Sequence, residues 1–319
     1  MENPTLEPAT IAIRSERVMK HLKEVVIGQE RTVQLMWAAM LTGGHVLIEG
    51  VPGLGKTLLV RSLGQVIDAS FARIQFTPDL MPADVTGTKV FDLQSGRFNF
   101  KQGPLFTQLL LADEINRTPP KTQSALLEAM EEGQITVDGE SRPLPAPFFV
   151  VATQNPIEYE GTYPLPEAQL DRFALQLTMD YPGEEEELEV LRGHRVTTRR
   201  ESALSPIVTA EEILAFRRQV ERIRAEDSVI RYVASLVRAT RTHPQVLLGA
   251  SPRAGTSLLA LSRAVAAMDA RDYVTPDDVK WVIKPALRHR LIMSPDVELE
   301  GFKTDDLIEE ITRSVPVPR

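Results

Sequence analysis

Residues 50–57 read GVPGLGKT, which matches the spacing G-x-x-x-x-G-K-[ST] of a phosphate-binding loop. An apolar run at 45–48 precedes this stretch and a helical pattern at 57–67 follows it, so the expected order is strand, glycine-rich turn and helix. The glycines allow the backbone to turn tightly and to approach an anion. Backbone N–H groups and the positive end of the helix can then hold phosphates. The stretch predicts a nucleoside triphosphate site, with an ordinary glycine-rich turn as the alternative.

Two side chains at the end of this loop have chemistry of their own. Lys56 carries a positive charge toward the terminal phosphates, and the Thr57 hydroxyl can bind Mg²⁺. The residues of this stretch that we expect to contact the nucleotide are Gly50, Val51, Pro52, Gly53, Leu54, Gly55, Lys56, Thr57 and Leu58. Upstream, VIGQ at 26–29 is either a helix-breaking turn or a contact with the adenine through Val26 and Ile27.

A second motif, LLLADE at 109–114, places acidic residues where a strand ends. Its apolar part is short and continuous, which is typical of a buried parallel strand. Asp113 follows the phosphate-binding loop by about sixty residues and is a candidate to hold Mg²⁺. Glu114 is the candidate to orient or deprotonate the attacking water. Acids after a strand are also common in turns, but the loop upstream favours the functional interpretation.

Three further polar residues are candidates for the site. Asn155 ends the next strand of the pattern and would reach the same end of the sheet, although Asn-Pro is also a turn signature. Arg172, before the last strand, is either an arginine finger for a neighbouring subunit or a surface ion pair with Asp171. Arg253 occupies the second position of an expected helix, where a cation opposes the helix dipole at a cost of roughly 0.3–1 kcal/mol. This misfit favours placement for a ligand over a chance surface arginine.

The order of elements predicts an α/β fold followed by a helical domain. Parallel strands flanked by helices are expected at 45–48, 71–76, 109–112, 148–152 and 174–178. Hairpins are expected at 90–100 and 134–147, and the aromatic residues of the first are either core or presented to a partner. Beyond Pro182-Gly183 the pattern is helical, with no convincing strand. We therefore expect an α/β nucleotide domain at 1–183 and a smaller helical domain at 184–319.

Composition limits the class of protein. The chain has 319 residues, 43% hydrophobic and 25% charged, which is typical of a soluble globular protein. It has no run of the ~20 apolar residues that a membrane span needs, and its start does not resemble a secretory signal. It contains no cysteine, which excludes disulfides and thiol catalysis, and only five histidines. A cytoplasmic protein is the simplest expectation.

The net charge of −8 disfavours general binding to nucleic acid, whose affinity comes largely from phosphate neutralisation. Two arginine-rich runs, at 192–200 and 217–224, could form a local basic patch. Both are interleaved with acids or follow the acidic run at 184–187, which favours solvated helix faces. Nucleic acid is therefore not expected as a partner.

These motifs together resemble those of the AAA+ ATPases and, within them, the MoxR family. The resemblance extends from about residue 26 to about residue 293. The motifs follow one another in the order of that family: VIGQ, GVPGLGKT, RIQFTPDLMPADVTG, GPLFTQLLLADEINR, PPKTQSALLEAMEE, VVATQNP and LPEAQLDRF, with ASPRAG in the lid. The run RIQFTPDLMPADVTG, with ADEINR and LPEAQLDRF, is the most specific part. No motif position departs from the pattern.

The resemblance implies a role for each of the first four candidates. Lys56 and Thr57 match the Walker A motif of the family, and Asp113 and Glu114 match its Walker B motif. ATP and Mg²⁺ are the implied cofactors, and ATP hydrolysis is the implied reaction.

The remaining candidates match elements that act around the nucleotide. Asn155 matches sensor 1, Arg172 matches the arginine finger and Arg253 matches sensor 2. The hairpin at 91–100 matches an insert that follows the second strand, and the excursion at 134–147 matches the hairpin before sensor 1. In related rings such inserts face the central pore or a partner.

Members of this family form hexameric rings and act as chaperone-like ATPases, often with von Willebrand factor A domain proteins in metal-cofactor maturation or complex assembly. The resemblance therefore implies a homo-oligomer, expected to be a hexamer, that remodels protein clients. A magnesium-chelatase-like motor subunit and a nucleic-acid-linked motor stay open as alternatives, because related ATPases carry similar inserts. A GTPase is disfavoured, because the sequence contains no Asn-Lys-x-Asp.

Overall fold

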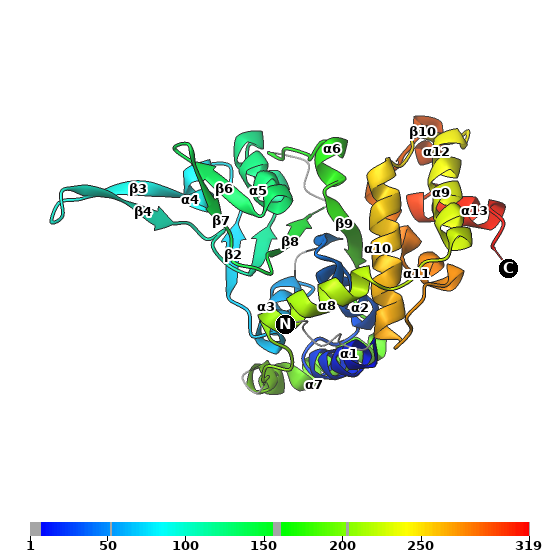
Figure 1. The fold of residues 1–319 in the computed structure, drawn as a ribbon, viewed down its shortest axis with the longest axis horizontal. Helices are drawn as coiled ribbons and strands as arrows, with labels where there is room; N and C mark the ends of the chain where they lie inside the picture. The colour runs from blue at the N-terminus through cyan, green and yellow to red at the C-terminus, as the bar shows by residue number, and fades with distance from the viewer. Residues whose placement is uncertain (1–7, 52, 156–160, 202–203, 319) are drawn as a thin grey trace.

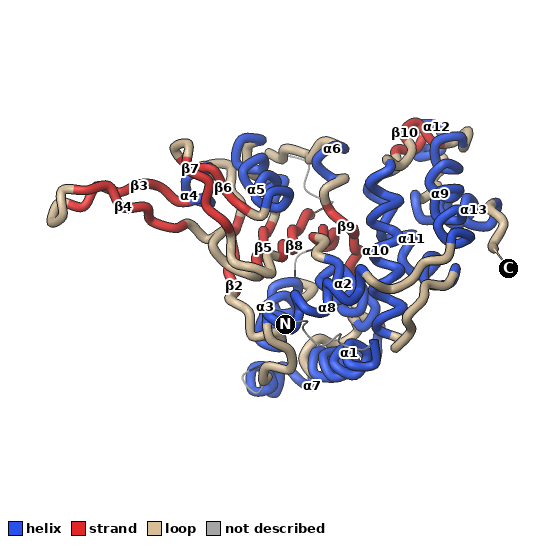
Figure 2. Tube along the Cα trace, viewed as in Figure 1, coloured by secondary structure: helices blue, strands red, loops and turns tan. Residues whose placement is uncertain are grey.

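The computed structural model describes residues 8–51, 53–155, 161–201 and 204–318, so Pro52 of the phosphate-binding loop lies outside the described residues. A parallel sheet with strand order β2-β5-β8-β1-β9 lies at the centre (Figure 2). Its strands are β1 (His45–Gly50), β2 (Phe71–Gln75), β5 (Leu109–Asp113), β8 (Phe149–Gln154) and β9 (Phe173–Met179). The predicted α/β fold with five parallel strands is confirmed.

The register of the strands defines two opposite ends of the sheet. Where β1 begins, His45 pairs with Phe173 of β9, and where β1 ends, Gly50 pairs with Met179. Asp113, at the end of β5, pairs with the last residue of β2. We call the end where strands finish the carboxyl end and the end where they start the amino end. Ligands of open parallel sheets bind at the carboxyl end.

Helices cover both faces of the sheet, because successive side chains of a strand point to opposite sides. Val46 and Ile48 lie in one hydrophobic cluster, and Leu47 lies in the other. The helices of the first half are α1 (Pro8–Lys23), α2 (Glu30–Thr42), α3 (Lys56–Val66), α4 (Pro82–Thr86), α5 (Pro120–Glu132) and α6 (Glu167–Leu170). The first three cover the Val46 face, and α5 covers the Leu47 face (Figure 1).

The second half of the chain is helical with one exception. Its helices are α7 (Glu184–Glu201), α8 (Ala210–Glu221), α9 (Asp227–Thr242), α10 (Pro252–Met268), α11 (Pro276–Leu287), α12 (Pro295–Leu299) and α13 (Thr304–Ser314). The expectation of no strand here is wrong, because β10 (Val246–Leu248) pairs antiparallel with β11 (Ile292–Met293). Strands of three and two residues are too short to produce an alternating pattern. Within the described ranges, no helix combines the length and the apolarity that crossing a membrane requires.

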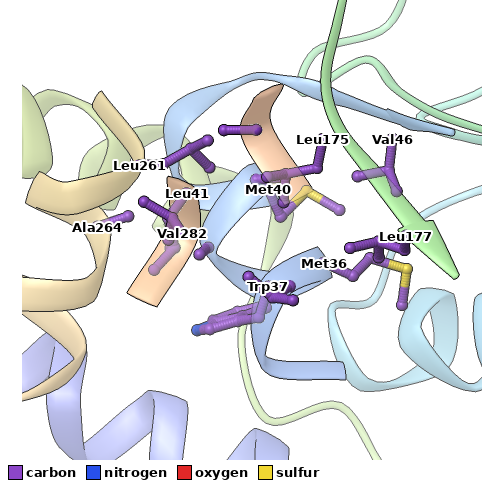
Figure 3. Packing of buried hydrophobic residues seen from close by; sticks show 14 of the residues in the cluster. Met36, Trp37, Met40, Leu41, Val46, Leu175, Leu177, Leu261, Ala264 and Val282 are labelled. Carbon is purple, nitrogen blue, oxygen red and sulfur yellow. The ribbon is translucent and has the colours of Figure 1, made fainter. Parts of the chain in front are cut away.

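The helical half packs on the sheet through a continuous apolar core (Figure 3). Leu261 of α10 and Val282 of α11 lie against α2, near Met40 and Leu41. These side chains are fully buried, and each such burial contributes roughly 1.5–3 kcal/mol. The nucleotide-binding half and the helical half are therefore held together by hydrophobic packing as well as by the chain that connects them.

The structure corrects the expectation for one arginine of the run at 217–224, in which Arg218, Arg222 and Arg224 are exposed as expected. Arg217, on α8, is mostly buried and donates from Nε to the carbonyl oxygen of Met40 at 2.9 Å. Burial lowers the pKa of Arg217 to about 10, which leaves it charged at neutral pH. The guanidinium of Arg217 lies at the carboxyl terminus of α2, where its positive charge interacts favourably with the helix dipole. It therefore anchors α8 on α2 and does not belong to a solvated face. The side chains at 193–200 lie outside the described residues.

Both predicted hairpins are present, as β3 (Gly87–Asp92) with β4 (Arg97–Gln102) and β6 (Gln134–Val137) with β7 (Glu140–Pro143). The first projects far from the body of the molecule (Figure 1). The rings of Phe91 and Phe98 contact each other at a tilt of 59°, with 5.1 Å between their centroids, and both are exposed. Phe100 instead packs against Phe106, with the guanidinium of Arg142 over its ring. Phe100 therefore packs against the core as one expectation had it, whereas Phe91 and Phe98 are exposed.

Candidate active site

The phosphate-binding loop joins β1 to α3 at the carboxyl end of the sheet. Gly53 and Gly55 have φ angles of 89° and 79°, which glycine adopts without strain. Gly50 is required for a different reason, because a Cβ there would lie 2.7 Å from the carbonyl oxygen of Met179. Gly55 is the N-cap of α3. It has no side chain that could bind the first N–H groups of the helix, so these groups can receive an anion.

Lys56 lies at the centre of this end of the sheet. It is half-buried, and its Nζ donates to the carbonyl oxygen of Gly50. Burial lowers the pKa of Lys56, and the carboxylates of Asp113, Glu114 and Glu49 oppose this shift. The fold therefore brings the loop lysine and the acidic pair of LLLADE together, as the sequence predicts.

Asp113 ends β5 with both carboxylate oxygens occupied. Its Oδ2 accepts from Arg73 of β2 at 2.7 Å, and its Oδ1 accepts from the Thr153 hydroxyl of β8 at 2.6 Å. Thr57, in the first turn of α3, and Asp113 offer hydroxyl and carboxylate oxygens, which are the hard donors that Mg²⁺ prefers. The residues present therefore fit a magnesium ion.

Glu114 follows in a left-handed conformation, with φ 57° and ψ 50°, that is uncommon for residues other than glycine. Its N–H donates to Thr153 Oγ1 at 2.9 Å. Its Oε2 accepts from Gln75 at 2.7 Å and lies 3.1 Å from Arg117 Nε. The contacts from Arg73, Gln75, Arg117 and Thr153 were not anticipated from the sequence. The signal was the alternation of polar residues at 73 and 75, on one face of the strand beside Asp113.

The other residues that we expect to contact the nucleotide differ in their surroundings. Asn155 follows β8 at the carboxyl end and is 6% exposed. Val26 is 5% exposed and belongs to the hydrophobic core, and Leu58 packs against the same core. Ile27 is partly exposed, and a cleft of about 380 Å³ begins at the next residue, Gly28. This cleft is lined by the start of α2, the end of β9 and the helical second half of the chain, which we call the lid.

The lid contributes an arginine to this end that the sequence did not single out. Arg288, in the 3-10 turn η2 (Arg288–Arg290), donates to Thr178 Oγ1 at 3.2 Å and pairs with Asp305 at 2.6 Å. Burial raises the pKa of Glu49, and the positive charge of Arg288 opposes that shift. Arg288 therefore lies close to the residue that precedes the phosphate-binding loop.

Arg172 and Arg253 lie at the amino end of the sheet, away from the phosphate-binding loop. Arg172 stands one residue before Phe173, which pairs with the first residue of β1. Arg253 joins it there, because both guanidiniums bind Glu131 of α5, at 3.0 and 3.3 Å. The structure brings these two candidates together and does not bring either of them to the phosphates of its own chain. The alternative pairing of Arg172 with Asp171 does not form.

Asp171 instead joins the sheet to the lid. Its Oδ1 accepts from Arg290 Nε at 2.6 Å, and its Oδ2 accepts from the Ser251 hydroxyl at 2.8 Å. Arg290 is 6% exposed and also donates to the carbonyl oxygens of Phe173 and Ala286. Ser251 caps α10, the helix that carries Arg253. This network fixes Arg253 of the lid beside Arg172, which precedes β9.

A parallel sheet in this order, with a phosphate-binding loop after β1, an acidic pair after β5 and a helical lid, defines an AAA+ ATPase. Residues 45–175 match the family described as "ATPase family associated with various cellular activities (AAA)". Residues 238–311 match the family described as "AAA lid domain".

Similar proteins identify the family within this class. The chain is 40% identical to Chaperone MoxR1 of Mycobacterium tuberculosis over 95% of this chain and 82% of that protein. It is 47% identical to the uncharacterized protein YeaC of Bacillus subtilis over 95% and 94%. A crystal structure from Cytophaga hutchinsonii, named "putative ATPase", is 40% identical, with a TM-score of 0.91 over 98% of this chain and 97% of that one. The chain belongs to the MoxR family of AAA+ ATPases.

Proposed function

We propose that this ATPase works as a homo-oligomeric ring, expected to be a hexamer, that remodels protein clients. One observation carries the ring: the phosphate-binding loop and the arginines Arg172 and Arg253 occupy opposite ends of one sheet. Neither Arg172 nor Arg253 therefore reaches the terminal phosphate bound to its own chain. A head-to-tail contact, in which the amino end of one subunit meets the carboxyl end of the next, supplies them and closes into a ring.

One chain supplies the binding half of each site. We assign Lys56 to the terminal phosphates and Thr57 and Asp113 to Mg²⁺, which when bound neutralises charge on the phosphates. Glu114 orients and deprotonates the attacking water, and Asn155 holds the γ-phosphate or that water. The cleft beside Gly28 supports placing the nucleoside between the first half and the lid.

The neighbouring chain supplies the charge-stabilising half. Arg172 and Arg253 bind the γ-phosphate of the adjacent subunit, where a guanidinium stabilises charge that builds up during transfer and can contribute ~10³–10⁵ in rate. Their exposed fractions of 29% and 48% leave both side chains accessible to a neighbour. Ser251 and Asp171 keep the two arginines together, so the neighbour presents them as one unit.

The two hairpins support a role in client binding. The exposed Phe91 and Phe98 offer an apolar surface on the projecting hairpin. Lys89 joins this hairpin to Asp138 and Glu140 of the second, so we expect the two to act together. A von Willebrand factor A domain protein is the proposed partner, and metal-cofactor maturation or complex assembly is the proposed process.

We also propose that the chain divides into its two domains at residue 183, after the last strand of the sheet ends at Met179.

Mixing of two inactive variants tests the shared site. Arg172→Ala removes the arginine from each subunit, and Glu114→Gln removes the base, so neither variant alone should hydrolyse ATP. In a mixed ring, a Glu114→Gln subunit supplies Arg172 to the intact carboxyl end of its neighbour, and phosphate release should return in part. The same rescue is expected for Arg253→Ala. Absence of rescue for both arginine variants, in rings that are shown to be mixed, would contradict the shared site.

A further inference from the structure

Glu131, near the end of α5, binds two arginines from different parts of the fold. Its Oε2 lies 3.0 Å from an Arg172 nitrogen, and its Oε1 lies 3.3 Å from an Arg253 nitrogen. One carboxylate thus uses both oxygens to hold the guanidinium that precedes β9 beside a guanidinium of the lid. Two cations at this separation repel each other, so the carboxylate is what makes their proximity favourable.

Both partners in this contact are placed against the dipoles of their own helices. Arg253 is the second residue of α10, where the helix dipole is positive, and Glu131 is the last but one of α5, where it is negative. Each placement is unfavourable for its own helix. The last turn of α5 contains no basic residue and the first turn of α10 contains no acidic one. Such local conflicts are expected at functional positions.

The backbone around this contact is fixed. His45 binds the carbonyl oxygen of Met130, the residue before Glu131, at 3.0 Å. Asp171 and Ser251 tie the segments that carry the two arginines to each other at 2.8 Å. The side chains, in contrast, are 29% to 48% exposed, and exposed ion pairs are weak and exchangeable. The frame therefore keeps the arginines in place while the carboxylate between them can leave.

On the basis of the shared site proposed above, we propose that Glu131 is the counter-ion of Arg172 and Arg253 in the unassembled chain, and that a triphosphate bound to a second copy of the chain displaces it. The two carboxylate oxygens stand in for two oxygens of a phosphoryl group, because a guanidinium binds carboxylate and phosphate with the same planar geometry. Glu131 is a positioning residue, since it acts through the arginines and does not touch the reacting atoms.

The exchange has a direction. A terminal phosphate carries more charge than one carboxylate and attracts the two guanidiniums more strongly. Glu128 and Glu132 line a hollow of about 310 Å³ on the Arg172 side, so their negative charges repel a phosphate there. Arg253 is the more exposed of the two arginines, at 48%. The neighbour's triphosphate therefore approaches from the lid side and meets Arg253 first, while Glu131 withdraws toward solvent.

The concentration dependence of ATP hydrolysis tests this exchange in the full-length chain. Glu131→Gln removes the competing charge, so hydrolysis should reach half its maximum at a protein concentration about fivefold lower, an estimate for two exposed ion pairs. Glu211→Gln removes the same charge from an exposed position on α8 that contacts neither arginine, and its midpoint should stay near the wild-type value. An unchanged midpoint in Glu131→Gln, or an equal shift in Glu211→Gln, would overturn the proposal.

A binding measurement separates this proposal from that of the ring. In a Lys56→Ala background, inorganic triphosphate is titrated into dilute protein while the Nε–H signals of Arg172 and Arg253 are followed by NMR. Glu131→Gln should tighten triphosphate binding several-fold. If binding does not tighten, Glu131 is not a competitor, whether or not rings form. If binding tightens while hydrolysis is independent of protein concentration, the counter-ion role stands and the ring proposal fails.

Discussion

The two ends of the sheet carry the same kinds of charge in opposite arrangements. At the carboxyl end, the carboxylate of Asp113 forms an ion pair with the side chain of Arg73. At the amino end, the guanidiniums of Arg172 and Arg253 both form ion pairs with the carboxylate of Glu131. One end therefore keeps acids ready for a cation, and the other keeps cations ready for an anion. A chain with two complementary ends of this kind is suited to meet copies of itself head to tail.

The two ends also differ in how they are built. The carboxyl end uses residues at strand ends and partly exposed hydrogen bonds, such as that from Arg73 to Asp113, with side chains 46% and 15% exposed. The amino end contains a network around Arg290, whose side chain is 2% exposed. This difference predicts that changes at the carboxyl end alter catalysis, whereas changes inside the amino end alter the stability of the fold.

The largest effect expected at the carboxyl end is the loss of hydrolysis in Glu114→Gln. The amide keeps the shape of the side chain and removes the general base, which typically contributes about 10²–10⁴ in rate. Lys56 and the glycine turn are untouched, so a fluorescent ATP analogue should bind as it does to the wild type. Phosphate release and equilibrium binding measure the two effects. Glu211→Gln, an exposed change on α8, is the matched control. If Glu114→Gln hydrolyses ATP at the wild-type rate, the base has been assigned wrongly.

The next effect concerns stability at the amino end. Arg290→Met should lower the free energy of unfolding by about 3–5 kcal/mol, because it breaks a buried ion pair with Asp171 and leaves buried carbonyl oxygens without a donor. Arg73→Met at the carboxyl end breaks a pair in which the arginine is 46% exposed, and should cost less than about 1 kcal/mol. Urea titration measures both. Equal losses would contradict the difference between the two ends.

The sequence predicts the carboxyl end better than the amino end, for a physical reason. Strand, loop and helix at 45–67 and LLLADE at 109–114 are local patterns, and parallel strands bring their carboxyl ends together without further information. The contact of Glu131 with Arg172 and Arg253 joins residues 41 and 122 positions apart and depends on how the lid docks. No periodic pattern in the sequence indicates how the lid docks on the first half of the chain. The local trace used in the prediction was the misfit of Arg253 with its helix dipole, and Glu131 has the corresponding misfit at the end of α5.

Acid should weaken the amino end selectively. Burial lowers the pKa of His45 to about 4, and burial also lowers the pKa of His289 well below its ordinary value. Both imidazoles bind backbone carbonyl oxygens at this end, of Met130 and Phe173 respectively. Above pH ~6.5 both histidines are neutral in the folded and the unfolded chain, so they add no pH dependence. As pH falls from there toward 4, the unfolded chain gains protons that the folded chain does not, and stability declines by up to about 1.4 kcal/mol per pH unit for each histidine.

Urea titrations at pH 7 and pH 5.5 measure this decline. His45→Gln should remove part of the pH dependence, because glutamine does not titrate in this range. His21→Gln, on α1 and far in sequence from both ends, is the control and should keep the wild-type dependence. If the stability of His45→Gln falls between the two pH values as steeply as that of the wild type, His45 does not carry the effect.

The smallest expected effect is at Gln75 and returns to the carboxyl end. Gln75 and Arg117 both reach Oε2 of Glu114, so the amide of Gln75 competes with a water molecule for this oxygen. Gln75→Ala leaves the ion pair with Arg117 and removes a neutral donor, so the basal rate of hydrolysis should rise about fivefold, which corresponds to ~1 kcal/mol for one hydrogen bond. Gln75→Asn keeps an amide with a shorter reach and should give a smaller rise. A fall in rate would mean that Gln75 holds Glu114 in its productive position, and that the contacts of the carboxyl end, like those of the frame at the amino end, serve to place groups rather than to restrain them.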